Sequence, residues 1–368
     1  MGTRFATFAV AVVAAALSAC GDSDHHTPRE QTEPEPAIVV VDLGSVSLTA
    51  ANQAQTFDVT AERASSLVIV ADGGEATDID ISRLRTPSHL ELITPDRGDT
   101  NPLTGSVSPQ DLGGSVATAI VASSLAVPLD VGVYSFSVAS FNAAGTPVPA
   151  IVHLTAIINH RDAPASGVLP VRAFFVGTPG LDAASAASSP VFQTVFDEFR
   201  RDFGRIGIDV ELVDTVDIDG DPGTRLAVLA VLDETTDRVV PDLNLNRQSD
   251  EMDELFTLSG DRTGNVISVF FVREFFTESG EVAVSGAAPG PSFLSGTAHS
   301  GIAVSTLGGL DQQSELDLTH IGHDLAREVA RYLGARGAVD PEDFTADQQV
   351  LLLRNPAVVS APPGENAH

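Results

Sequence analysis

The chain has 368 residues, 43% of them hydrophobic, which is enough for two globular domains with a core each. Its 50 acidic residues outnumber 20 basic ones, all of them arginine, and the net charge of −30 argues against nucleic-acid binding, which needs a cationic surface. No Trp and only two Tyr argue against an aromatic platform for sugar stacking, though not against polar sugar binding.

The N-terminus predicts export. The apolar run from Phe5 to Leu17 is 13 residues long, too short to span a bilayer but suited to the core of a signal peptide. It ends in Leu-Ser-Ala-Cys20, which resembles the bacterial lipobox. This resemblance implies that residues 1–19 are removed and that Cys20 carries the lipid. The alternative is an ordinary secretory signal with an incidental Cys.

Membrane attachment is expected to depend on this lipid alone. No other apolar stretch is long enough to span a bilayer, and a chain with one Cys forms no internal disulfide. Residues 20–37 are polar and spaced by Pro, which predicts a disordered tether. We expect a protein lipid-anchored to a bacterial membrane, periplasmic or at the cell surface, with the outer membrane favoured.

Residues 38–158 predict an antiparallel β-sandwich. Short apolar stretches alternate with Gly, Pro and Asp, and Tyr134–Val138 shows period-2 alternation most clearly. No helical period appears, and nothing here indicates a catalytic site. The expected strands are Ser45–Ala50, Thr56–Thr60, Leu67–Ala71, Ala117–Ala122, Val131–Ala139 and Pro147–Ile158.

Residues 168–358, after a linker at Asn159–Gly167, predict an α/β or α+β domain because strand and helix patterns alternate. The expected strands are Val171–Val176, Ile208–Val216, Asn265–Phe275 and Gly301–Thr306. The expected helices are Pro190–Phe203, Asp250–Leu258, Leu318–Gly334 and Thr345–Arg354.

The segment Leu318–Gly334 has helical periodicity. One face is apolar and is expected to be buried: Leu318, Ile321, Leu325, Val329 and Tyr332. The opposite face is polar and is expected to be solvated, with ion pairs at i,i+3 between Asp324 and Arg327 and between Glu328 and Arg331.

The same helix carries an altered zinc-protease pattern. In the frame H-E-x-x-H-x-x-G-x-x-H, the general base is Glu328 and the turn glycine is Gly334. The three His positions hold Arg327, Arg331 and Gly337. A guanidinium group stays protonated and has no lone pair for a metal, so this pattern predicts a protease fold without protease chemistry.

A wider resemblance supports this interpretation. Residues 168–358 resemble metzincin-like, pappalysin-type metallopeptidase domains of secreted bacterial lipoproteins, in the segments 265–272, 285–291, 300–304, 321–329 and 344–356. The chain departs from them in lacking the His ligands and a Met after the motif. The resemblance implies a zincin-like cleft without zinc and without enzymatic activity, left to bind or scaffold a peptide or protein. Arg327 and Arg331 would favour an acidic group.

Two other interpretations stay open. A shifted frame could make His320, His323 and Asp324 metal ligands, with His299 as a further one, in an active zinc metallopeptidase. The chain could also be a purely structural envelope lipoprotein.

A weaker pattern, Asp217, Asp219 and Asp221, suggests calcium, although Pro222 and Val228 depart from the calcium-loop pattern. No cofactor is expected.

Overall fold

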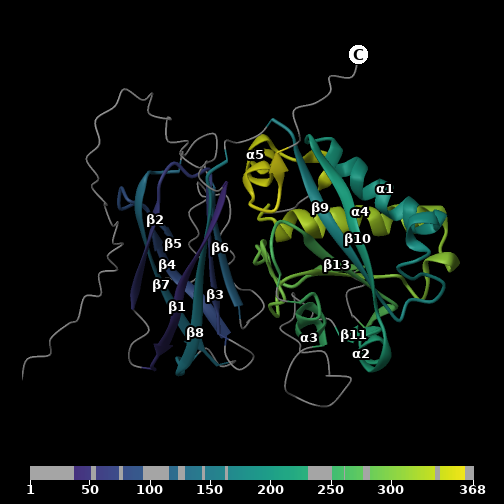
Figure 1. Ribbon diagram of the computed structural model, residues 1–368, viewed down its shortest axis with the longest axis horizontal. Helices are drawn as coiled ribbons and strands as arrows, with labels where there is room; N and C mark the ends of the chain where they lie inside the picture. Colours follow the sequence, from purple (N-terminus) through teal and green to yellow (C-terminus); the bar gives the residue numbers. More distant parts are fainter. Residues whose placement is uncertain are drawn as a thin grey trace, which may run out of the picture. The chain divides into compact units, whose positions relative to one another are not determined.

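The computed structural model describes residues 37–50, 55–73, 78–93, 116–122, 129–142, 146–161, 165–230, 251–260, 262–276, 282–335 and 340–360. These residues belong to one compact unit that is rich in β-structure and of the α+β class (Figure 1). Within this part of the chain, no helix has the length and apolar character needed to cross a membrane. The predicted signal peptide, Cys20 and nearly all of the predicted tether lie outside the described residues.

Two four-stranded antiparallel sheets pack face to face around one core. The first sheet has the order β1-β8-β3-β6, formed by Ile38–Leu48, Ala150–Asn159, Ser66–Asp72 and Val116–Ala122. The second has the order β2-β7-β4-β5, formed by Thr56–Ala61, Gly132–Phe141, Asp78–Arg85 and Glu91–Ile93. All six strands expected in this region are present; β4 and β5 were not expected.

Side-chain alternation explains how the two sheets meet. On β7, Tyr134, Phe136 and Val138 are fully buried between the sheets, whereas Val133 on the same strand is 45% exposed. Such alternation buries one face of each sheet and leaves the other for solvent or further packing. The first sheet uses its second face too, because Val68, Val70 and Ile157 lie in a separate buried cluster.

A six-stranded mixed sheet forms the rest of the molecule's framework. Its order is β10-β9-β13-β17-β15, and β18 pairs with the start of β9. The strands β10, β9, β13 and β17 are parallel, whereas β15 and β18 run antiparallel to their neighbours. These strands are Ile208–Ile218, Gly167–Val176, Ile267–Val272, Ile302–Ser305, Ala283–Ser285 and Val359–Ser360.

Helices cover both faces of this sheet. On one face, the core contains side chains of α1 (Pro190–Gly204), α4 (Glu315–Tyr332) and α5 (Ala346–Arg354). On the other face, the core contains side chains of α3 (Glu251–Thr257) and of the small parallel pair β11 and β14 (Val228–Ala230 and Glu274–Phe276). Shorter elements are α2 (Gly220–Arg225), β12 (Arg262–Thr263), β16 (Leu294–Ser295) and three 3-10 turns at Ala186–Ser188, Leu310–Gln312 and Pro341–Asp343.

One expected strand is divided. The run Asn265–Phe275 was expected to form a single strand, but β13 ends at Val272 and β14 begins at Glu274. Between them, the N–H of Arg273 donates to the carbonyl of Ala227 at 2.9 Å, so the chain leaves the central sheet there to pair with β11. Apolar periodicity alone does not show such a change of partner.

The expected helix near the C-terminus is confirmed as α4. A capping box between Ser314 and Asp317 starts it, and Gly334, with φ of +106°, follows its end. The whole expected apolar stripe is buried, with no side chain more than 4% exposed: Leu318, Ile321, Leu325, Val329 and Tyr332. The expectation of a fully solvated opposite face is wrong at Glu328, which is only 3% exposed because β15 packs over it.

Candidate functional site

Glu328 is held by side chains of β15 and of α4 itself. The hydroxyl of Ser285 on β15 donates to its Oε2 at 3.3 Å, and Nη1 of Arg331 donates to its Oε1 at 3.0 Å. Nε of Arg327 lies 3.6 Å from the same Oε1. The carboxylate at the predicted general-base position is therefore buried and ion-paired, and the arginines at two of the three predicted His positions lie next to it.

Both expected i,i+3 ion pairs on α4 are confirmed. Nη1 of Arg327 lies 3.0 Å from Oδ1 of Asp324, and the pair between Arg331 and Glu328 has the same length. The side chains of Arg327 and Arg331 remain 38% and 33% exposed, so each guanidinium group still reaches solvent. The third altered position, Gly337, lies outside the described residues.

The strand β15 ends the six-stranded sheet next to α4. Its hydrogen bonds show which backbone groups point toward β17: the carbonyl of Val282 accepts from Ser305 at 2.7 Å, and the N–H of Gly286 donates to Gly301 at 3.0 Å. Hydrogen-bonded residues alternate in an antiparallel ladder, so Val284 also faces β17, whereas the backbone of Ala283 and Ser285 faces outward. No described strand pairs with that outer side.

The glycine-rich turn after β15 is fitted to the end of α4. The N–H of Gly290 donates to the carbonyl of Tyr332 at 2.8 Å. A Cβ atom at Gly290 would lie 1.8 Å from Cε2 of Tyr332, so only glycine allows the backbone to lie against this ring. Burial raises the pKa of the Tyr332 hydroxyl, which keeps it neutral. The turn fixes the position of β15 relative to α4.

His323 has different neighbours from those that the sequence suggested. Its Nδ1 lies 2.9 Å from Oδ2 of Asp202, and a ligand atom of Glu198 lies within 4.8 Å of both. Asp324 is paired with Arg327 instead. In the described part of the chain, these three residues are the one group of His, Cys, Asp and Glu side chains close enough to share a metal ion.

Arginines also approach this group. Glu198 pairs with Arg201, and Oδ1 of Asp202, which accepts no hydrogen bond, lies 3.5 Å from Nη1 of Arg205. Burial raises the pKa of Glu198, and the neighbouring Arg201 opposes that shift. Two buried carboxylates, one His and two cations form a polar network that links α1 to α4 and could also hold a metal ion.

The sequence analysis missed Glu198 and Asp202. They lie four residues apart on α1, on the side that faces α4. Each is followed directly by a buried Phe, Phe199 or Phe203, so the sequence gives only a weak indication that the two acidic residues are buried too. A close helix crossing brings His323 to them: a Cβ atom at Gly322 would lie 2.4 Å from the carbonyl of Val195. No local sequence period reveals such a crossing.

An acidic cavity lies where β9 and β10 end. Its volume is about 460 Å³, and its lining includes Asp182, Asp217, Asp219 and Arg273. Asp217 accepts a hydrogen bond from the N–H of Ala183 at 2.7 Å. Asp221, the third residue of the suggested calcium pattern, lies 3.7 Å from Arg225 and is not part of the lining. The structure thus brings together two of the three expected ligands.

Two remaining sequence candidates are separate from these groups. His320 is exposed on α4, and His299 is buried in the turn before β17. Nε2 of His299 lies 3.4 Å from Oδ1 of Asp253. The predicted set of His320, His323, Asp324 and His299 therefore does not form one cluster within the described residues.

Comparisons with known proteins give no family. No protein-family model and no curated protein matches the sequence. Among solved structures with weak likeness, a DUF4785 family protein from Legionella pneumophila has a TM-score of 0.20 and 7% identity, over 38% of this chain and 38% of that one. A family two carbohydrate esterase from Cellvibrio japonicus has a TM-score of 0.15 and 8% identity, over 64% of this chain and 78% of that one. The protein YXIM from Bacillus subtilis has a TM-score of 0.17 and 9% identity, over 80% of this chain and 64% of that one. The chain thus spans little more than a third of the first structure, and TM-scores this low carry no argument about function.

Proposed function

We propose that this protein is a lipid-anchored protein of the bacterial cell envelope whose zincin-like domain is catalytically inactive and binds an extended peptide or protein segment. One observation carries the proposal: Glu328, the residue at the position of the general base, is 3% exposed and is ion-paired with Arg331. A base in this state, with no His at the metal positions beside it, has no metal-bound water to deprotonate.

The topology around α4 supports the zincin-like part of the proposal. The antiparallel strand β15 ends the sheet and contacts α4, the helix with the altered motif, and the resemblance implies a cleft that holds extended peptide against an edge strand. The backbone groups of Ala283 and Ser285 point away from β17, and no described strand bonds to them, although both residues are less than 7% exposed. The N-terminal segment with Cys20 supports the anchor.

The two arginines of α4 set the expected preference. Their side chains are about one third exposed, and both lie close to Glu328, which accepts a hydrogen bond from Ser285 of β15. Guanidinium groups bind carboxylates through paired hydrogen bonds, so an extended segment with acidic side chains fits this surface best.

A peptide-binding experiment tests this function. The purified full-length protein is titrated with a peptide of alternating Glu and Val, its Gln counterpart, and a version N-methylated at alternate residues. We expect the Glu peptide to bind most tightly, the N-methylated one to fail, and Arg327→Gln to weaken binding of the Glu peptide about tenfold. Arg200→Gln, at a partly exposed arginine of α1, is the matched control.

Three results would each overturn a part of the proposal. Equal binding of the N-methylated peptide would exclude strand addition at β15. Peptide cleavage that disappears with a chelator would exclude an inactive domain. For the anchor, Cys20→Ser should move the protein from the membrane fraction to the soluble fraction, and an unchanged distribution would exclude lipidation.

A metal site is the second candidate, favoured by the group of Glu198, Asp202 and His323. A carboxylate–His set of this kind suits zinc or another transition metal. However, His323 and Glu328 are five residues apart on α4, about 140° around the helix axis, so such an ion would not face the Glu328 base. Metal analysis of the purified protein and of His323→Gln decides between the candidates: stoichiometric metal lost in this variant, together with peptidase activity, would favour an enzyme.

A further inference from the structure

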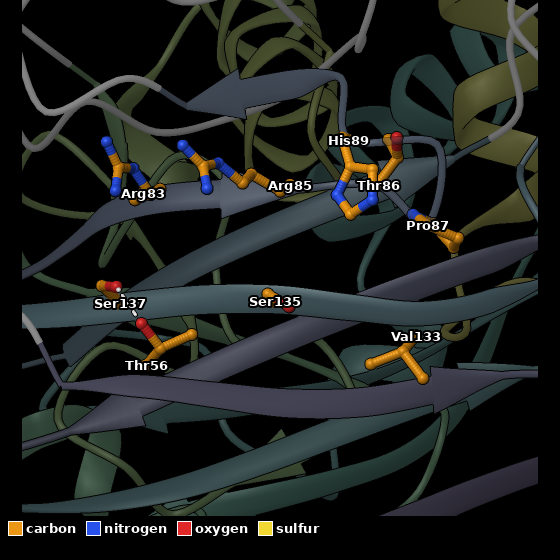
Figure 2. Close-up of a pocket in the computed structure, with 9 residues that line it drawn as sticks. All are labelled: Thr56, Arg83, Arg85, Thr86, Pro87, His89, Val133, Ser135 and Ser137. Atoms are coloured by element: carbon orange, nitrogen blue, oxygen red, sulfur yellow. Dashed lines mark hydrogen bonds between the residues drawn. The ribbon is translucent and has the colours of Figure 1, made fainter.

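A second cavity lies on the outer face of the sheet β2-β7-β4-β5, away from the core that the two sheets share. Its volume is about 400 Å³. Nine residues line it, and Figure 2 shows them: Thr56, Arg83, Arg85, Thr86, Pro87, His89, Val133, Ser135 and Ser137. Among these described lining residues there is no Asp or Glu, in a chain that has 50 acidic residues.

A β-bulge places the two arginines on this face. Ile79 and Ile81 point into the core, and continued alternation along β4 would send residues 83 and 85 inward as well. The register shifts between Ile81 and Arg83, so Leu84 becomes the buried residue and Arg83 and Arg85 point outward. Bulges re-aim side chains in this way and are frequent beside functional sites.

Hydroxyl groups lie across the sheet from the arginines (Figure 2). Arg83 is opposite Ser137, which in turn is opposite Thr56 on β2. Arg85 is opposite Ser135, whose hydroxyl donates to Asp58 at 2.7 Å. The floor of the cavity thus combines fixed cations with hydroxyls that can both donate and accept hydrogen bonds.

The arginines share a single carboxylate. Nε of Arg85 donates to Oε1 of Glu91 at 2.8 Å, and Nε of Arg83 lies 3.5 Å from the same oxygen. That Nε of Arg83 is buried and has no hydrogen-bond partner. Their side chains are 38% and 40% exposed, and that of Glu91 is 32% exposed. Two guanidinium groups therefore have donors left over, and Glu91 can be displaced by a competing carboxylate.

We propose that this cavity binds a small hydroxylated carboxylate with the chemistry of a sugar acid. Its carboxylate would bind Arg83 and Arg85, and its hydroxyls would bind the hydroxyls of Thr56, Ser135 and Ser137. The ligand's carboxylate would take the place of Glu91 on the two arginines. Recognition is polar because the cavity has no aromatic ring for stacking other than the imidazole of His89. This inference is independent of the peptide site at β15.

Calorimetric titration of the full-length protein with D-glucuronate tests the proposal, with D-glucose and glucuronic acid methyl ester as neutral comparisons and N-acetyl-aspartate amide as a peptide-like carboxylate. We expect D-glucuronate alone to bind well. Arg83→Gln should weaken its binding about tenfold, and Glu91→Gln should tighten it a few-fold, because the internal competitor is gone. Arg63→Gln, at an exposed arginine outside the cavity, is the matched control.

Several outcomes would overturn the proposal. Absence of D-glucuronate binding to both the wild type and Glu91→Gln would mean that the arginines only hold β5 to β4. Equal binding of glucose or of the methyl ester would exclude recognition by the carboxylate. Equal binding of N-acetyl-aspartate amide would exclude a role for the hydroxyl groups of Thr56, Ser135 and Ser137. Thermal unfolding of each variant shows that the fold is retained.

Discussion

Two parts of the molecule use the same set of groups in different surroundings. On the outer sheet face, Arg83 and Arg85 share Glu91; on α4, Arg327 and Arg331 share Glu328. The carboxylate is 32% exposed in the first set and 4% exposed in the second. Burial of the shared carboxylate is the main difference between them.

Burial decides what each set can do. A carboxylate that has left water must keep its cationic partners, because an unpaired buried charge is costly, so Arg331 is bound to Glu328. A carboxylate that remains in water binds its partners weakly and can be exchanged for another. The carboxylate of the first set can therefore be exchanged for that of a ligand, whereas Glu328 stays fixed and a ligand could meet only the exposed parts of Arg327 and Arg331.

The largest expected effect is a loss of stability at acidic pH that comes from the burial of another ionisable group, His299. Burial lowers the pKa of His299 to about 4 from an ordinary 6.5, and a backbone hydrogen bond with Val116 opposes the shift. Well above pH 6.5, His299 is neutral in both the folded and the unfolded chain, so it does not change the free energy of unfolding. Below pH 6.5, the unfolded chain takes up a proton that the folded chain excludes. This group should therefore cost about 3 kcal/mol of stability by pH 4.

Urea unfolding between pH 7 and pH 4.5 measures this loss. His299→Gln should lose less stability over this range than the wild type does, whereas His320→Gln, at an exposed His of α4, should follow the wild type. Identical pH slopes for the wild type and His299→Gln would contradict the assignment of a buried neutral imidazole.

The next largest effect is expected when the ion pair of the buried carboxylate Glu328 is removed. Arg331→Met keeps the length of the side chain but removes the cation 3.0 Å from Glu328. Because Arg331 is one third exposed, we expect a loss of about 2 kcal/mol, below the range for fully buried pairs. Arg327→Met, which removes a cation 3.6 Å from Glu328 and a partly exposed pair with Asp324, should cost less. Equal losses in both variants, measured by urea unfolding, would contradict this ranking.

The sequence predicted those features that depend on local periodicity. The stripe on α4 from Leu318 to Tyr332 and the ion pair between Asp324 and Arg327 follow from helical spacing alone, and both are present. The six expected strands of residues 38–158 follow from alternation and turn residues. The membership of these residues in a zincin-like domain stays a prediction.

Features that depend on tertiary contacts could not be predicted in this way. The polar network of Glu198, Asp202 and His323 needs the close approach of α1 and α4 at Gly322. The cavity of the outer sheet needs the bulge in β4, because strict alternation from Ile81 would have buried Arg83. In each case, a contact distant in sequence or an irregular residue determines which side chains meet.

The smallest expected effect concerns the more exposed carboxylate, Glu91, and its arginines on β4. Arg85→Gln removes the pair with Glu91, yet we expect no measurable change in the midpoint of urea unfolding, because water and salt replace exposed ion pairs at little cost. The hydrogen bond from Arg85 lowers the pKa of Glu91, so the carboxylate stays charged in mildly acidic solution and the pair is present throughout a titration at pH 5 to 7. A midpoint that falls as far as in Arg331→Met would show that Glu91 is as firmly bound to its arginines as Glu328 is, and the distinction between a replaceable and a fixed carboxylate would then be lost.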